Sequence, residues 1–368
     1  MCTLVTTTGI KYRKQYATTP ITMNFGGANH SLHIAQALSK PTSLTVPPVD
    51  ILRAGLVYAG FDHARQEKNK EARRIKWFKA FYGVAPLTVA AMFEDISDVK
   101  KDANVKEFLM ALNWLFLYDT YPVLSGRWKF SEEFIMKSVA EYGYLIEDLS
   151  RKKIVFDLKD DLTLGRSVDC CNFMVQEMRL DPNSKWYDKK SNSCGLVSCI
   201  AFTKDCSTVL DISYSIFILL HGKKYEFCLA LREARCVWIS GPHVPSTHDI
   251  TVFRGGDSDD SDGWDKSALY FQLGKGEKCV GDSGYVGEPG KLVVEKDDHP
   301  LHVKKFLSRA KNHQETFHSR LKSFNILGHR FRHKGGVEQK MRKHEMAVRA
   351  VACIVQYDYE NGHPPFDI

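Results

Sequence analysis

The hydrophobic residues in the first half of this chain follow a helical spacing. Between about residues 60 and 150, apolar positions recur every three or four residues, the period of an amphipathic helix. The clearest run comprises Val105, Phe108, Leu109, Leu112, Leu115 and Phe116. Residues 76–96 combine a short helical pattern, a Gly/Pro break and a second helical pattern, which is typical of a helix-turn-helix-like unit. We therefore predict an all-α, helix-turn-helix-like domain over residues 60–150.

After residue 153 the apolar residues gather in short runs that are typical of strands. These runs cover residues 154–158, 162–172, 173–178, 225–231, 236–240 and 278–282, and helical patterns follow at about 303–325 and 339–357. Strands with interleaved and following helices predict an α/β domain over residues 153–368, a mixed sheet flanked by helices. The opening segment is rich in Thr, Ser and Pro and has no sustained period, so we expect residues 1–58 to be largely disordered.

Residues 198–224 interrupt the strand pattern. The segment is rich in Ser, Ile, Cys and Leu, and its flanks would form one continuous strand if they were joined directly. We predict that it is a translated intron or a lineage-specific insertion. A spliced message without these codons would support the intron, and an unspliced message as the only species would exclude it.

Composition narrows the class of protein. The chain has 368 residues, enough for two domains, and its 43% hydrophobic and 26% charged content is ordinary for a globular protein. It has no apolar run of about eighteen residues and no secretory signal pattern, so we expect no membrane span and no secretion. Its ten cysteines are scattered without paired zinc-ligand spacing, which favours reduced thiols in the cytosol or nucleus.

The net charge of +7 is unevenly distributed along the chain. Residues 301–350 contain thirteen Lys and Arg against three Glu, a net charge of +10, together with six His. A concentrated cationic segment is typical of a surface that binds a polyanion such as nucleic acid. A solvated helix face without a ligand would have the same composition.

Three acids stand in local settings that favour metal binding. Asp169 lies in the apolar run LTLGRSVDCCN, Asp282 lies between glycines in CVGDSGYVG, and Glu315 lies on the polar face of the helical pattern LSRAKNHQETFHSRLKSFN. An acid inside an apolar strand is unfavourable unless it is paired or bound to metal. Each acid taken alone could equally cap a turn or form an ion pair on a helix. Taken together, carboxylates from separate elements suit a pair of hard divalent cations, Mg²⁺ or Mn²⁺, of the kind used in phosphodiester chemistry.

The order of these acids carries a resemblance to a known family. The sequence VDCC around Asp169 is similar to the first-acid motif of the PIF/Harbinger transposase superfamily of DDE endonucleases, except that Cys170 stands where that motif usually has Gly. GDSGY around Asp282 matches the second-acid motif, and RAKNHQETFHSRLK around Glu315 resembles the third. STHDITVF, residues 246–253, resembles the HD block of the family, and the similarity covers about residues 70–368.

The resemblance implies an RNase H-like sheet. In such a sheet the first acid lies on the central strand, the second lies at the end of a neighbouring strand, and the third lies on a helix that crosses that edge. Asp169, Asp282 and Glu315 would then coordinate Mg²⁺ or Mn²⁺ in a nuclear DNA endonuclease/transposase. Its partners would be DNA, a Myb/SANT-like DNA-binding protein and further copies of the chain. The alternatives are a domesticated, non-catalytic DNA-binding protein, favoured by Cys170 and by the segment 198–224, and a decayed product that does not fold.

Other residues near the acids are weaker candidates. Asp249 either adds an acid to the site or is the N-cap of the helix that follows, with His248 beside it, and we favour a structural or supporting role. Lys311, Arg320 and Lys322 are expected to contact the DNA backbone. His313 and His318 either touch phosphate or metal-bound water or lie at the surface, which is commoner on a basic helix.

Overall fold

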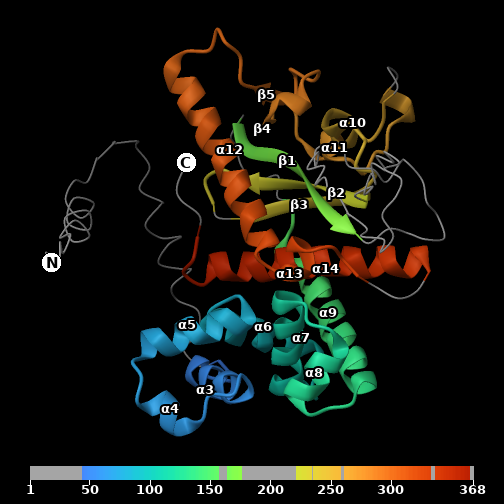
Figure 1. Ribbon diagram of the computed structural model, residues 1–368. Coiled ribbons are helices and arrows are strands. Elements are labelled where there is room, and N and C mark those ends of the chain that lie inside the picture. Colours follow the sequence, from blue (N-terminus) through green and yellow to red (C-terminus); the bar gives the residue numbers. More distant parts are fainter. Residues whose placement is uncertain are drawn as a thin grey trace, which may run out of the picture. The chain divides into compact units, whose positions relative to one another are not determined.

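The computed structural model describes residues 44–156, 164–175, 221–233, 235–257, 261–332 and 336–364. Its first part is helical (Figure 1). The helices are α3 (Pro48–Tyr58), α4 (His63–Glu67), α5 (Glu71–Tyr82), α6 (Pro86–Val99), α7 (Val105–Leu117), α8 (Tyr121–Trp128) and α9 (Glu132–Lys153). Gly83 ends α5 in the left-handed conformation and Pro86 opens α6, which confirms the predicted helix, break and helix. The assignment of this region as a helix-turn-helix domain stays a prediction.

Helix α3 corrects the predicted disorder of residues 1–58. Ile51 and Leu56 are fully buried, and the hydroxyl of Tyr82 on α5 donates a 2.8 Å hydrogen bond to the carbonyl of Gly55. The prediction is wrong for residues 48–58 because a short amphipathic helix follows the polar segment and packs against α5, α6 and α7. Residues 1–43 lie outside the described part of the chain.

The other part of the fold is the predicted mixed sheet, which has five strands among the described residues. Its strands are β1 (Leu164–Val175), β2 (His221–Ala230), β3 (Arg235–His243), β4 (Lys278–Gly281) and β5 (Leu292–Val294), in the spatial order β3-β2-β1-β4-β5. The pairs β1–β2 and β2–β3 are antiparallel, whereas β1–β4 and β4–β5 are parallel. The central strand is therefore β1, which carries Asp169.

Two strand predictions need correction. Residues 154–156 are not a strand, because α9 continues to Lys153 and the amide of Ile154 still bonds to the carbonyl of Ser150. The rest of that predicted strand lies outside the described residues. The runs 162–172 and 173–178 form a single strand over their described part, since no turn separates them, and β5 was not predicted.

Strand β2 begins inside the segment that we predicted to be an insertion. His221 pairs with Val175 and Lys224 pairs with Asn172, so residues 221–224 extend the β1–β2 ladder. Only 1% of Lys223 and 3% of Lys224 is exposed, so these residues belong to the sheet. Residues 198–220 lie outside the described part of the chain, and their origin stays a prediction.

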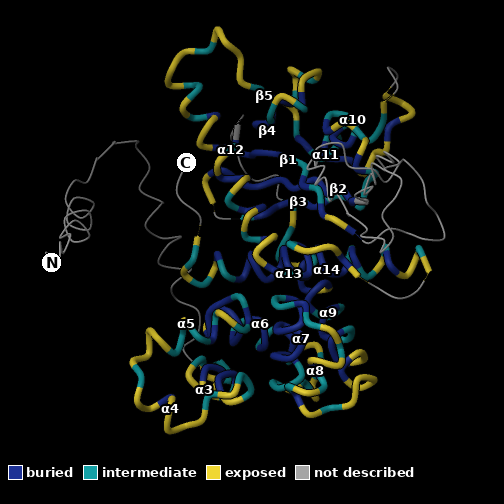
Figure 2. The backbone as a smooth tube through the Cα atoms, in the orientation of Figure 1, coloured by how far each residue is buried: buried dark blue, intermediate teal, exposed yellow. Residues whose placement is uncertain are grey.

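Helices cover both faces of the sheet. On one face lie α10 (Asp249–Arg254) and α11 (Leu269–Gln272), whose apolar residues share a core with β1, β2 and β3. On the other face α12 (Leu301–Lys322) crosses β1 and β4, followed by α13 (Asn325–Gly328) and α14 (Val337–Glu360) (Figure 1). The strands and α14 hold much of the buried backbone (Figure 2).

Helix α14 connects the helical part to the sheet. It packs against α6 and α9 on one side and against β3 on the other. Arg342 donates two hydrogen bonds of 2.8 Å to the buried carboxylate of Glu147 on α9, a bidentate pair. Among the described helices, none combines the length and hydrophobicity that crossing a membrane requires.

Candidate functional site

The register of β1 and β4 brings Asp169 and Asp282 together. The two strands are parallel, and Ser167 pairs with Val280. Two residues further along each chain come Asp169 on β1 and Asp282 just beyond β4. Because side chains alternate and neighbouring strands lie about 4.8 Å apart, both carboxylates lie at the same level of the same sheet face.

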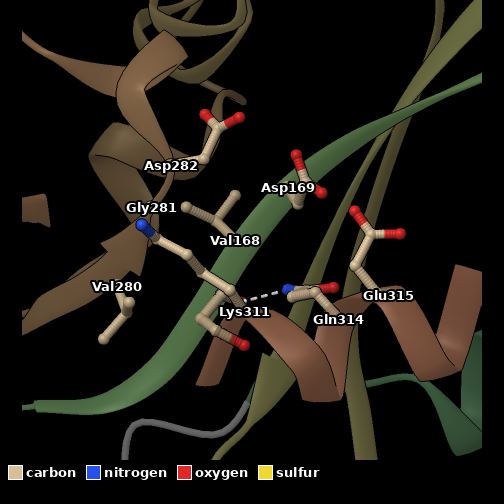
Figure 3. A pocket seen from close by; sticks show the side chains of 9 residues that line it. Val168, Asp169, Val280, Gly281, Asp282, Lys311, Gln314 and Glu315 are labelled. Atoms are coloured by element: carbon tan, nitrogen blue, oxygen red, sulfur yellow. Dashed lines mark hydrogen bonds between the residues drawn. The ribbon is translucent and has the colours of Figure 1, made fainter. Parts of the chain in front are cut away.

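Helix α12 places Glu315 beside these two acids. The side-chain amide of Gln314 donates hydrogen bonds to the carbonyls of Ser167 (2.8 Å) and Phe227 (3.3 Å), which ties this turn of the helix to β1 and β2. Glu315 directly follows Gln314, and it lines one pocket of about 90 Å³ together with Asp169 and Asp282 (Figure 3). The structure thus brings all three predicted acids to one place.

Backbone amides hold the two aspartates. Asp169 Oδ1 accepts a 2.8 Å hydrogen bond from the amide of Cys170, and Asp282 Oδ1 accepts one of 2.8 Å from the amide of Gly284. Gly284 is required here because a Cβ atom would lie 2.7 Å from Asp249 Oδ2 and 3.0 Å from Asp282 Oδ1. The Gly in the second-acid motif therefore permits close approach of Asp249 to the Asp282 turn.

The three acids differ in exposure, from mostly buried Asp169 through half-buried Asp282 to exposed Glu315. Burial raises the pKa of Asp169 to about 7, and the charges of Asp282, Asp249 and Glu315 add to the shift. Burial, and then Lys322, lowers the pKa of His318 to about 3, so its ring is neutral near pH 7. The pocket is therefore a region of concentrated negative potential that a cation would relieve.

The donor set fits a hard divalent cation. Mg²⁺ keeps several waters and is commonly held by one or two carboxylates together with substrate phosphates. In the described part of the chain, no group of three His, Cys, Asp or Glu side chains is placed to hold one ion. A site in which each ion takes only one or two of the three acids does not require such a group. The pocket volume of 90 Å³ leaves room for about three waters.

A second, larger pocket of about 400 Å³ adjoins the first and shares its three acids. Lys322 and His318 line this larger pocket, and Lys311 lines the smaller one, where its ammonium lies 3.1 Å from Glu295. Arg320 lines neither pocket, since its guanidinium bonds to the carbonyl of His363. Of the three basic residues expected at the DNA, two therefore lie beside the acids.

Asp249 is not the N-cap of α10, which was one of the two alternatives for this residue. The N-cap of α10 is His248, which is exposed and makes no capping hydrogen bond with its side chain. Asp249 is the first residue of the helix, 4% exposed, and its carboxylate lies 2.7 Å from the ammonium of Lys224. Its carboxylate lies close to Gly284 in the turn after Asp282, and it lines neither pocket.

Sequence reasoning missed Gln314 and Glu226 and favoured the wrong alternative for two histidines. Gln314 is 2% exposed, and His318 and His313 are 5% and 3% exposed, so the favoured surface position of both histidines is wrong. Glu226 is fully buried on the other sheet face beside Cys170, and burial, followed by Asp249, raises its pKa to about 8. The available signal was helical spacing, since Gln314 lies four residues after Ala310 and three before Phe317 of the apolar stripe.

A scan against protein-family models, a search of curated proteins and a search of solved structures each found no match for this chain.

Proposed function

We propose that this protein is a divalent-metal-dependent DNA endonuclease of the DDE transposase type. The observation that carries the proposal is the shared pocket of Asp169, Asp282 and Glu315, which are remote from one another in the sequence. They come from a central strand, the end of its parallel neighbour and a crossing helix. This placement supports an RNase H-like sheet, and it agrees with what the PIF/Harbinger resemblance implies.

The proposed roles follow from the positions of the side chains. Asp169, Asp282 and Glu315 would hold Mg²⁺ or Mn²⁺, which would supply a more acidic water and stabilise the leaving oxygen. Gln314 keeps α12 in register with β1, so that Glu315 stays beside Asp169. Lys311 and Lys322 would contact phosphates of the DNA strand as sequence-independent cations. DNA is the partner that this chemistry requires, in a nuclear setting.

A plasmid-nicking assay with Mn²⁺ tests the proposal. We expect the wild type to nick supercoiled plasmid and Asp282→Ala to lose this activity. Asp298→Ala is the matched control, since Asp298 is an exposed acid that lines neither pocket. Equal nicking by wild type and Asp282→Ala would show that the activity comes from elsewhere.

The alternative function is DNA binding without catalysis. It is favoured by Cys170, which stands where the first-acid motif of the family usually has Gly. A gel-shift assay on the same proteins separates the two functions. A folded wild type that binds DNA and does not nick it would support the non-catalytic protein, and nicking that depends on Asp282 would exclude it.

A further inference from the structure

His318 is a buried polar residue at the edge of the proposed metal site. It lies one turn after Glu315 on α12, lines the larger pocket and is 5% exposed. Its ring packs edge-to-face on Phe227, with ring centroids 5.6 Å apart. Phe227 is the residue directly opposite Asp169 in the β1–β2 ladder. The ring of His318 is therefore held on the same sheet face as the first acid.

The ring nitrogen nearest the site is directed at the Asp169 carboxylate. His318 Nδ1 lies 3.6 Å from Asp169 Oδ2, while Oδ1 accepts the hydrogen bond from the amide of Cys170. A shift of about 0.5 Å would bring Nδ1 within hydrogen-bond distance of Oδ2. The other ring nitrogen, Nε2, is buried and has no hydrogen-bond partner among the described residues. Packing alone does not require a nitrogen at either position.

We propose that His318 is a positioning residue for the metal site, which holds Oδ2 of Asp169 through an Nδ1–H donor while Cys170 holds Oδ1. Two donors on the two oxygens fix the plane of the carboxylate, so that its remaining lone pairs face the pocket. Hydrogen-bond partners of metal-binding side chains contribute about 10–100-fold to metal affinity in characterised sites. This inference rests on the proposed function and deepens it, since it assigns a partner to the first acid.

Binding of Mn²⁺ to the full chain, followed by the loss of the free-ion electron paramagnetic resonance signal, tests this role without measuring activity. His318→Phe keeps a ring against Phe227 and removes the donor, so we expect Mn²⁺ affinity to fall about 10–100-fold. His318→Asn places an amide N–H near the position of Nδ1, and we expect its affinity to remain close to that of the wild type. His313→Phe is the matched control, because His313 is on the same helix, is equally buried and lines neither pocket.

A double substitution distinguishes positioning from packing. In an Asp169→Asn background, His318→Phe is expected to cause no further loss of Mn²⁺ affinity, because its effect passes through Asp169. Three results would each overturn the role of His318. The first is a further loss of Mn²⁺ affinity when His318→Phe is added to Asp169→Asn, and the second is wild-type affinity in His318→Phe alone. The third is that His318→Asn binds Mn²⁺ as weakly as His318→Phe. Failure of folded wild type to bind Mn²⁺, or binding that Asp282→Ala leaves unchanged, would instead overturn the proposed function. Circular dichroism confirms that each variant is folded.

Discussion

Replacing Lys224 by Met removes the cation that faces Asp249. The two charges lie 2.7 Å apart, and only 3% and 4% of their side chains is exposed. Removing one partner of a buried ion pair typically costs about 3–5 kcal/mol, because the other charge stays buried. The ammonium also donates a short hydrogen bond to the carbonyl of Thr247. Since whole domains are stable by about 5–15 kcal/mol, we expect Lys224→Met to remove a large share of the free energy of unfolding.

Urea unfolding followed by circular dichroism measures this loss. Lys275→Met is the matched control, because Lys275 is exposed and its substitution leaves the pair intact. Replacing both partners, as Lys224→Met with Asp249→Leu, is expected to restore most of the stability, since an apolar pair needs no compensation. The reasoning fails if Lys224→Met unfolds within about 0.5 kcal/mol of the wild type, the range of ordinary surface substitutions. It also fails if the double variant is no more stable than the single one.

The same ion pair tests the boundary of the suspected insertion. Deleting residues 198–220 removes no residue that the structure describes, whereas deleting 198–224 also removes four ladder positions of β2, the last of which is Lys224. We expect the shorter deletion to keep a cooperative unfolding transition and the longer one to be less stable by at least about 3 kcal/mol. Equal stability of the two deletions would mean that the sheet does not need residues 221–224.

Two further predictions concern the acids themselves. Gly284→Ala would place a Cβ atom 2.7 Å from Asp249 Oδ2, so we expect Asp282 to shift and nicking to fall about 100-fold. Gly290→Ala, which meets nothing within 4 Å, should nick like the wild type, and equal activity of the two variants would refute the crowding argument. The carboxyl of Asp169 has a pKa of about 7 in the folded state and 3.8 in the unfolded chain. The free energy of unfolding therefore falls by about 4 kcal/mol as the pH rises from 3.8 to 7. Asp169→Asn has no proton to lose and should lack this decline in urea unfolding with EDTA, and identical pH profiles would contradict the raised pKa.

Local signals place the three acids on two strands and a helix, and the family resemblance singles them out as a site. An apolar run before Asp169 and a short apolar strand before Asp282 predict two strands, and helical spacing puts Glu315 opposite the apolar stripe. The order of the strands could not be predicted from these local signals, because the pairing of β1 with β4 depends on contacts remote in sequence. The family resemblance alone implied that the strand of Asp169 is central and next to the strand that ends at Asp282. That pairing is what aligns Asp169 with Asp282.

Buried polar residues on α12 were harder to predict. A count of apolar residues finds the stripe that includes Ala310, Phe317 and Leu321, but it cannot recognise a polar side chain whose burial is compensated by hydrogen bonds. Gln314 is such a residue, since its amide donates to two strand carbonyls. His318 is buried because the buried face of α12 is wider than its apolar stripe and also includes His313 and Gln314.

The errors at residues 48–58 and 221–224 have a common cause. Composition is an average over a segment of sequence. Where a segment contains both an irregular stretch and the start of a helix or strand, the longer stretch dominates the average. Thr, Ser and Pro outnumber the few apolar residues of α3, and the Ser- and Ile-rich segment outweighs the first residues of β2. Tertiary packing determines where a helix or strand begins. The burial of Leu56 in α3 and of Lys224 in β2 depends on contacts with residues elsewhere in the chain.

The electrostatics of the pocket differ from those of two buried acids elsewhere in this fold, Glu147 and Asp249. Glu147 is paired with Arg342, and Asp249 is paired with Lys224, so each of these carboxylates has a cation on a neighbouring element. Among the described residues, the partner within ion-pair distance of Asp169 is a neutral His318, and Lys311 in the same pocket is directed at Glu295. The raised pKa of Asp169 reflects this unfavourable arrangement. Three carboxylates around one pocket are an arrangement that a cation from solution would stabilise, as the proposed metal-dependent site requires.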